Sequence, residues 1–122
     1  GKVSFEIHQT VQVFNIFDFW RLRQEVNHQF KSFKFRNFIV FTPEFHSPSF
    51  IPDNWKDKAK EIAIAEGAFD DEKHIFKEIY KYDYKPEAMK ALIANTHLMD
   101  PARNQFLKDY YPLCHEMLEE IE

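Results

Sequence analysis

The sequence predicts a helix-rich α/β fold, in which a short strand–helix–strand unit with parallel strands precedes three to five helices. Three observations support this: near the N-terminus apolar residues fall at every second position, over residues 19–30 they recur every three or four, and residues 38–41 form an uninterrupted apolar run. A chain of 122 residues is long enough for one hydrophobic core. We therefore expect a single domain over 1–122, divided into the strand–helix–strand unit (1–42) and a loop with a helical C-terminal part (43–122).

The first strand and the helix after it follow from the spacing of apolar residues. The strand period is carried, with Gln9 as the exception, by Val3, Phe5, Ile7, Val11 and Val13. Asn15 is a residue type that caps helices, and Asp18 follows in an acidic first turn. The helix would bury a stripe formed by Phe19, Trp20, Leu22, Val26 and Phe30.

The second strand is predicted around the run Phe38–Phe41. A strand with one open face should alternate, and this run does not, so we expect a central strand covered on both faces and ended by Pro43. Such a strand needs neighbours at both edges. Either helices cover the edges, or strands from a second copy or a partner protein complete the sheet.

A basic segment leads into this strand, with phenylalanines between the charges. It consists of Phe30, Lys31, Phe33, Lys34, Phe35 and Arg36. Alternating cations and aromatic rings can bind single-stranded nucleic acid. We favour the simpler interpretation, a strand entrance with the phenylalanines inward and the charges outward.

Capping and breaking residues divide the remainder of the chain into helices. Asp53 would cap a helix that ends at Gly67, Asp70 or Asp71 would start the next, and Pro86 fits the first position of another. We expect Asp100-Pro101 to cap a further helix through Leu107. Tyr111-Pro112 would end that helix and open the last one.

Composition excludes several classes of function. The two glycines, Gly1 and Gly67, are too few for a phosphate-binding loop, and the net charge of −4 gives no attraction to nucleic acid or to a membrane surface. One cysteine, Cys114, excludes a disulfide or an all-cysteine metal site within this chain. We expect a cytoplasmic protein that binds neither nucleic acid nor membranes.

No catalytic or metal-binding pattern stands out. Six histidines are scattered singly, and His115 beside three glutamates is typical of a solvated acidic face rather than a metal site. Apolar neighbours indicate that Cys114 is a core thiol. Tyr80, Tyr82 and Tyr84 form an aromatic cluster that suits either a binding surface or packing between helices. The sequence therefore predicts no catalytic residue and no metal ligand.

Two segments and the tail carry a family resemblance. The segments are Thr10–Ile16 and Asn37–Glu44, and the tail contains Leu98, Asp100, Arg103 and Tyr111-Pro112-Leu113. Together they resemble the last strand–helix–strand and the closing helices of the twitch-domain radical S-adenosylmethionine proteins that are common in phages.

The resemblance implies where a cofactor would bind. In that family the ends of the last strands line the adenosine side of the cofactor, which points to Asn15, Thr42 and Pro43. A helix cap and a strand terminator explain the same residues equally well. The family holds its iron–sulfur cluster with three cysteines in a Cys-x3-Cys-x2-Cys loop, and this chain has one cysteine. S-adenosylmethionine and the cluster are therefore expected only if the chain belongs to a larger parent.

Two functional hypotheses follow. The first is a non-catalytic interaction or structural module, phage-encoded if the resemblance holds, which binds a protein partner or a second copy of itself through a sheet edge or an aromatic surface. The alternative is the C-terminal part of a radical S-adenosylmethionine enzyme, which is inactive without its cluster-binding half. Whether the chain takes part in catalysis stays open at this level.

Overall fold

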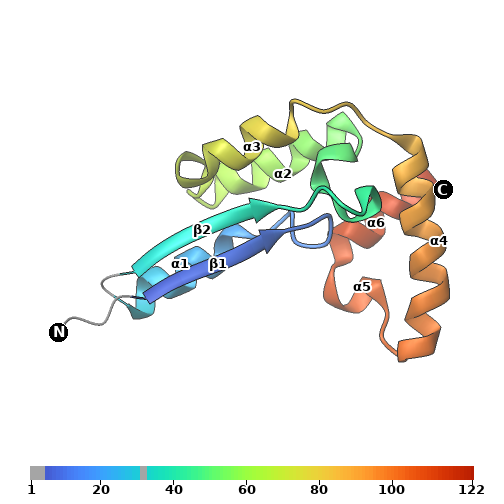
Figure 1. Ribbon diagram of the computed structural model, residues 1–122, viewed down its shortest axis with the longest axis horizontal. Helices are drawn as coiled ribbons and strands as arrows, with labels where there is room; N and C mark the ends of the chain where they lie inside the picture. Colours follow the sequence, from blue (N-terminus) through green and yellow to red (C-terminus); the bar gives the residue numbers. More distant parts are fainter. Residues whose placement is uncertain (1–4, 31–32) are drawn as a thin grey trace.

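A computed structural model of the protein describes residues 5–30 and 33–122, and it has the helix-rich α/β fold predicted from the sequence (Figure 1). Its first three elements are β1 (Phe5–Val11), α1 (Trp20–Gln29) and β2 (Phe33–Ile39). Two 3-10 helices follow, η1 (Glu44–His46) and η2 (Pro48–Phe50). The remaining elements are α2 (Asp53–Ala65), η3 (Phe69–Glu72), α3 (Lys73–Ile79), α4 (Pro86–Arg103), α5 (Leu107–Tyr110) and α6 (Pro112–Ile121).

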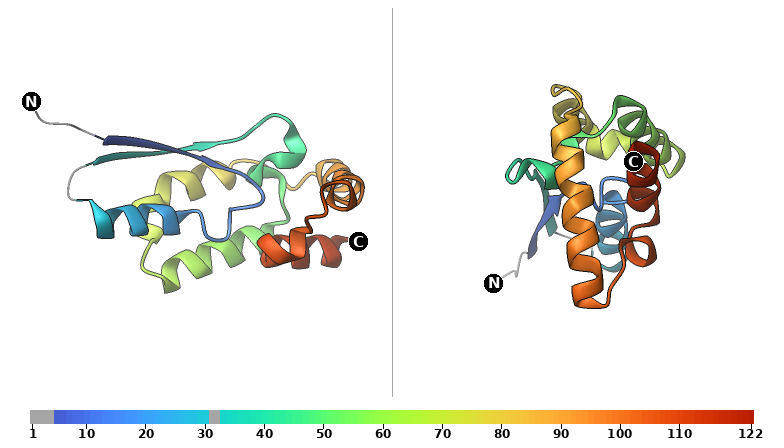
Figure 2. Two further views of the ribbon diagram at one scale, coloured as in Figure 1. Left: turned by 90° about the horizontal axis from the view of Figure 1, so that it is seen from below. Right: turned by 90° about the vertical axis from the view of Figure 1, so that its right-hand side faces the viewer.

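The two strands are parallel, as predicted, and in the described residues they form a sheet on their own. Their register runs from Phe5 opposite Phe33 to Val11 opposite Ile39. Figure 2 shows the sheet as an outer layer with helices on one side only. The other side exposes Glu6, His8, Thr10, Lys34, Arg36 and Phe38. One face of the sheet is therefore open to solvent.

The expectation of a second strand covered on both faces is wrong. Burial alternates along β2, the strand ends at Ile39, and the Phe38 side chain is 48% exposed. The apolar run misled because it straddles the end of the strand: Phe38 faces outward, and Phe41 lies beyond the strand against Tyr82, with ring centroids 5.6 Å apart. The neighbouring segment agrees with the favoured interpretation, with Lys34 and Arg36 exposed between half-buried phenylalanines. Lys31 lies outside the described residues.

Asn15 does not cap α1, contrary to the sequence-based expectation. The helix begins at Trp20, after Phe19, without a side-chain cap. The Asn15 Oδ1 instead accepts a hydrogen bond from the Gln12 N–H at 2.7 Å, and its Nδ2 donates to the Thr10 carbonyl at 3.0 Å. Asparagine readily closes turns through its own backbone neighbourhood, and here it turns the chain away from β1.

The predicted apolar stripe of α1 is confirmed in part. Phe19, Trp20 and Val26 are buried, whereas Leu22 is 42% exposed and Phe30 46% exposed. The helix therefore buries a narrower face than the spacing suggested, because the two-stranded sheet covers only part of it.

A buried carboxylate joins the sheet to the helices. Glu72 of η3 is fully buried and accepts hydrogen bonds from Arg23 Nε at 2.7 Å and from Asn37 Nδ2 at 2.6 Å. The Arg23 guanidinium also lies 4.6 Å from the centre of the Phe35 ring. A buried charge is tolerated when it is paired and hydrogen-bonded. Glu72 thus ties together α1, β2 and the start of α3.

A second group of side-chain hydrogen bonds holds α1 against the end of α2. Glu66 accepts hydrogen bonds from Arg21 Nε and Nη2, at 3.0 and 2.9 Å, and from Trp20 Nε1 at 3.1 Å. The bonds from Arg21 lower the pKa of Glu66. The chain then turns at Gly67, whose φ of +73° ends the helix where the sequence predicted.

The ends of α2 and α3 are joined by a buried lysine. The Lys56 side chain is fully buried, and its Nζ donates to the carbonyls of Ile79, at 2.8 Å, and Tyr82. These carbonyls lie at and just beyond the end of α3, where backbone acceptors lack intrahelical donors. Burial lowers the pKa of Lys56.

The long helix α4 begins at Pro86, as predicted, but ends later than expected. Asp100-Pro101 does not cap a new helix, because α4 continues through Pro101 to Arg103. Asn104 then adopts a left-handed conformation with φ 52°, and the N–H groups of Asn104 and Gln105 donate to the carbonyls of Pro101 and Asp100. This is the hydrogen-bond pattern of a Schellman motif, which is why the helix can stop there.

We expect Glu72→Gln to destabilise the fold by about 3 kcal/mol, because an amide cannot accept from both donors and leaves the Arg23 charge without its counterion. The free energy of unfolding in urea measures the effect. Glu78→Gln is the matched control, since Glu78 pairs with Lys81 at the surface. Equal losses in the two variants would contradict the anchoring role of Glu72.

Glu66 should make stability depend on pH at the acidic side. Its folded pKa lies below the usual 4.5, so its contribution is complete above the unfolded pKa and is lost as the pH falls through the folded pKa. We expect wild-type protein to be more stable than Glu66→Gln at pH 7, with the difference disappearing in acid. Unfolding curves at a series of pH values test this, and a constant difference would contradict it.

Candidate functional site

The described residues hold no group of three or more histidine, cysteine, aspartate or glutamate side chains placed to bind a metal ion. Three of the six histidines pair singly with carboxylates: His8 with Glu6 at 3.0 Å, His97 with Glu122 at 2.7 Å, and His115 with Glu119. These contacts are at the surface. Nothing in them provides the converging ligands that a metal site needs.

The thiol of Cys114 is placed in the core. The residue is fully buried, and burial raises its pKa to about 12. Because the thiolate is the nucleophilic form, this cysteine is unreactive at neutral pH. The structure therefore assigns Cys114 to packing, as its apolar neighbours in the sequence indicated.

The residues singled out by family position lie at one end of the sheet. Asn15 follows β1, while Thr42 and Pro43 follow β2, are exposed and share a cis peptide bond. The two loops are joined by the bond from Val13 N to the His46 carbonyl at 2.8 Å. Both polar atoms of the Asn15 side chain are engaged in its own turn. A cofactor role for Asn15, Thr42 and Pro43 stays a prediction.

The sheet presents backbone hydrogen-bonding groups along its edges. The hydrogen bond from Val40 N to the Val11 carbonyl, at 3.1 Å, shows which residues of β2 point their backbone N–H and C=O groups toward β1. Even-numbered residues of β2 therefore direct their N–H and C=O groups toward β1, and odd-numbered residues direct theirs toward the outer edge. Within the described part of the chain, no third strand pairs with that edge.

The two edges of the sheet differ in how open they are. At the β1 edge, the Thr10 carbonyl already accepts from Asn15, which closes the end of that strand. The β2 edge offers the odd-numbered residues Phe33, Phe35, Asn37 and Ile39. Of the two, the β2 edge is the longer open template for another strand.

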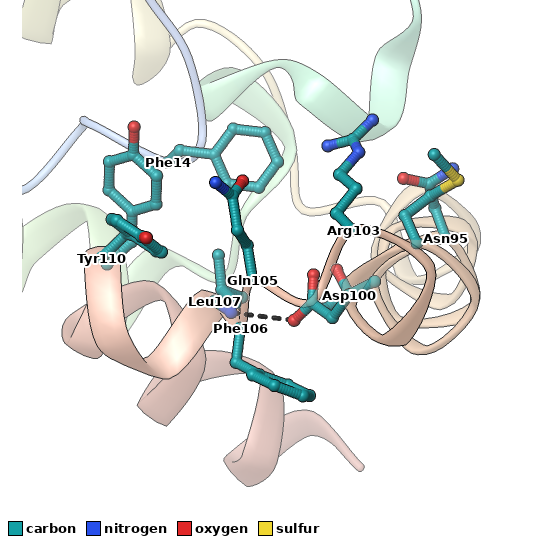
Figure 3. A pocket seen from close by; sticks show the side chains of 11 residues that line it. Phe14, Asn95, Asp100, Arg103, Gln105, Phe106, Leu107 and Tyr110 are labelled. Atoms are coloured by element: carbon teal, nitrogen blue, oxygen red, sulfur yellow. Dashed lines mark hydrogen bonds between the residues drawn. The ribbon is translucent and has the colours of Figure 1, made fainter.

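A groove with a volume of about 340 Å³ lies at the other end of the molecule (Figure 3). It is formed by α4, by α5 with the segment before it, and by the turn that follows β1. Asn95, Asp100 and Arg103 line one side in Figure 3, and Phe14 and Tyr110 line the other. The remaining lining residues are Thr96, Met99, Gln105, Phe106, Leu107 and Tyr111.

The polar groups of the groove are not all equally available. The Asp100 Oδ2 accepts a hydrogen bond from the Leu107 N–H at 2.8 Å, and this bond fixes α5 against α4. The Arg103 guanidinium points away from that carboxylate and makes no hydrogen bond or ion pair with any described residue. The groove thus combines aromatic walls with one cation that the described residues do not neutralise.

Sequence reasoning missed this groove. The sequence singles out Arg103 only through the family resemblance, Tyr111 only as a helix boundary and through that resemblance, and Phe14 by no signal at all. The late end of α4 is what brings Arg103 opposite Phe14, and capping rules predicted the wrong end. The only available signal was the aromatic density of Phe106, Tyr110 and Tyr111.

The tyrosine cluster 80–84 serves mainly to pack helices. The Tyr80 hydroxyl donates to Asp57 Oδ1 at 2.6 Å. The pKa of Tyr80 is raised, mainly by burial of the hydroxyl and also by this hydrogen bond. Tyr82 packs edge-on against Phe50, with centroids 5.7 Å apart, and Tyr84 contacts the core. Packing between elements accounts for these contacts, while Tyr80 and Tyr82 are still 40% and 39% exposed, so that a role as a binding surface stays a prediction.

Comparison of the chain with known protein families, with curated proteins and with solved structures finds no match. The resemblance to radical S-adenosylmethionine proteins therefore stays a hypothesis. None of the helices in the described residues has both the length and the apolar character needed to cross a membrane.

We expect the Cys114 thiol to resist modification. Incubation of the folded protein with an aromatic disulfide reagent at pH 7 should release almost no thiolate, because the thiol is buried and protonated. The same reagent in denaturant should react with one thiol per chain and serves as the control. Rapid labelling of the folded protein would show that the thiol is accessible.

Proposed function

We propose that the protein is a non-catalytic interaction module that binds an extended segment of a partner protein along the β2 edge. The observation that carries this proposal is the two-stranded parallel sheet, with an open edge and an open face. Addition of a strand to such an edge is a common mode of protein recognition. Pairing would engage the outward N–H and C=O groups of the odd-numbered β2 residues.

The poor coverage of the sheet supports the proposal. Even on the helix-facing side, Ile7, Phe33 and Phe35 are only half-buried, and Val11 is the strand residue that reaches full burial among those described. Two strands alone are marginally stable in water. A third strand beside β2 would cover more of Phe33 and Phe35 and extend the sheet over the helical layer.

Charge indicates what the added strand carries. Lys34 and Arg36 are exposed on the open face of β2, and Arg36 is already paired with Glu6 at 3.2 Å. On the β2 side of the sheet in Figure 1, α3 exposes Lys77 and His74, together with Lys73, which is paired with Asp70 at 3.2 Å. We infer a partner segment with acidic residues at alternate positions, which would lie beside Lys34.

The second candidate function is the C-terminal part of a radical S-adenosylmethionine enzyme. It is favoured by the parallel β1–α1–β2 unit, whose free edges would then pair with other strands of a barrel. The coding sequence upstream of Lys2 distinguishes the two proposals. A Cys-x3-Cys-x2-Cys motif there would support the enzyme, and the binding partner of β2 would then be the same polypeptide.

We expect Phe35→Pro to abolish pairing at the β2 edge. Proline removes the outward N–H at this position while leaving the bonds between β1 and the even-numbered residues of β2. Peptides selected from a random library for binding to the wild-type chain should lose at least about tenfold in affinity for this variant. Titration calorimetry measures the loss.

Phe35→Ala is the matched control, because it removes the same ring and keeps the N–H. Its affinity for the selected peptides should fall much less than that of the proline variant, because only the newly covered part of the Phe35 ring is lost. Lys34→Glu should reverse the preference for acidic peptides. Equal affinity of the proline and alanine variants, or selection of peptides that bind elsewhere, would contradict the proposal.

A further inference from the structure

We propose that the groove between α4 and α5 binds a small planar molecule that carries one acidic group, with Arg103 as the residue that recognises the acid. This inference goes beyond the proposed function, because the groove is lined by residues of α4 and α5, which lie at the opposite end of the molecule from the start of β2 (Figure 1). It rests on the shape of the groove, its aromatic walls and the unneutralised guanidinium.

The size and lining of the groove suit a flat aromatic ligand. Its volume of about 340 Å³ falls at the lower end of the range for small-molecule sites. Phe14 and Tyr111 face one another with ring centroids 5.6 Å apart, and Tyr110, which is 62% exposed, extends the aromatic wall. A planar ligand would stack on these rings and cover apolar surface that is now in water.

The charge of the ligand follows from Arg103. A guanidinium binds a carboxylate or a phosphate through two parallel hydrogen bonds, and that of Arg103 has no such partner among the described residues. The carboxylate of Asp100 does not compete, because it is bonded to the Leu107 N–H and points the other way. The acidic group would therefore lie at Arg103 and the ring toward Tyr110.

Amide side chains can complete recognition. Asn95 and Gln105 line the groove on either side of this position, and their side-chain amides make no hydrogen bond to the described residues. Each offers a donor and an acceptor to the ligand. A few converging polar groups in an apolar groove are typical of ligand sites.

The test uses three probes with the same indole ring, similar size and different charge: indole-3-acetate, indole-3-acetamide and tryptamine. Titrations into the isotope-labelled chain are followed through the side-chain amide signals of Asn95 and Gln105 by nuclear magnetic resonance. We expect saturable shifts with indole-3-acetate, weaker binding of the neutral amide, and the weakest binding of the cation.

Arg103→Gln should weaken binding of indole-3-acetate about tenfold and leave that of indole-3-acetamide unchanged. Arg36→Gln, on the sheet, is the matched control and should change neither. Tyr110→Ala should weaken both ligands, because it removes part of the stacking wall. The proposal is overturned if indole-3-acetate gives no saturable shift at millimolar concentration, if acid and amide bind equally to the wild-type chain, or if Arg103→Gln binds the acid as tightly as Arg36→Gln.

Discussion

The attachment of the sheet to the helices depends on the buried carboxylate of Glu72. A sheet of two strands has too little apolar surface to hold itself against a helical layer by burial alone. Arg23 from α1 and Asn37 from β2 both donate to this carboxylate, so three elements meet at one charged group. The arrangement sets the position of the sheet sharply, because any other placement would leave a charge buried without its partners.

This polar attachment has a consequence for the proposed function. A sheet held by hydrogen bonds at its centre can leave its edge and outer face uncovered without losing its position. The apolar core, by contrast, lies under the C-terminal end of β1 and among α2, α3 and α4, and includes Val11, Ile51, Ile79, Met89 and Leu92. The described residues in the N-terminal halves of the strands therefore contribute little to the apolar core.

Local sequence signals predicted the elements better than their ends and their environment. The period-two pattern predicted the first strand, and the apolar run predicted a second strand that in fact lies mostly in the basic-aromatic segment before it, at Phe33–Ile39. Pro86, Gly67 and Pro112 marked helix boundaries where the structure has them. Asn15 and Asp100 were misassigned because both have the chemistry of helix caps, yet one closes a turn and the other bonds to the N–H of a residue seven positions away. The spacing of residues in the sequence does not show which backbone N–H group such a side chain will reach in the folded chain.

The candidate sites were the least predictable part. An open sheet edge was expected from the sequence, because two predicted strands leave the backbone hydrogen-bonding groups at the outer edges of the sheet without a neighbouring strand. The groove depends on where α4 stops and on how α5 turns back, which are tertiary outcomes. The role of Glu72 was equally hidden: the sequence marked only Asp70 or Asp71 as a helix start, and nothing in it distinguished Glu72, the one buried residue of the three.

The long separation between Arg23 and Glu72, 49 residues along the chain, also constrains the order of assembly during translation. The segment that forms β1, α1 and β2 is synthesised before Glu72. Until Glu72 is present, Arg23 and Asn37 lack the carboxylate to which they donate. During that time the phenylalanines and the strand edges of this segment are exposed. A chaperone, or a premature encounter with another chain, therefore has most influence on folding while the β1–α1–β2 segment is present without Glu72.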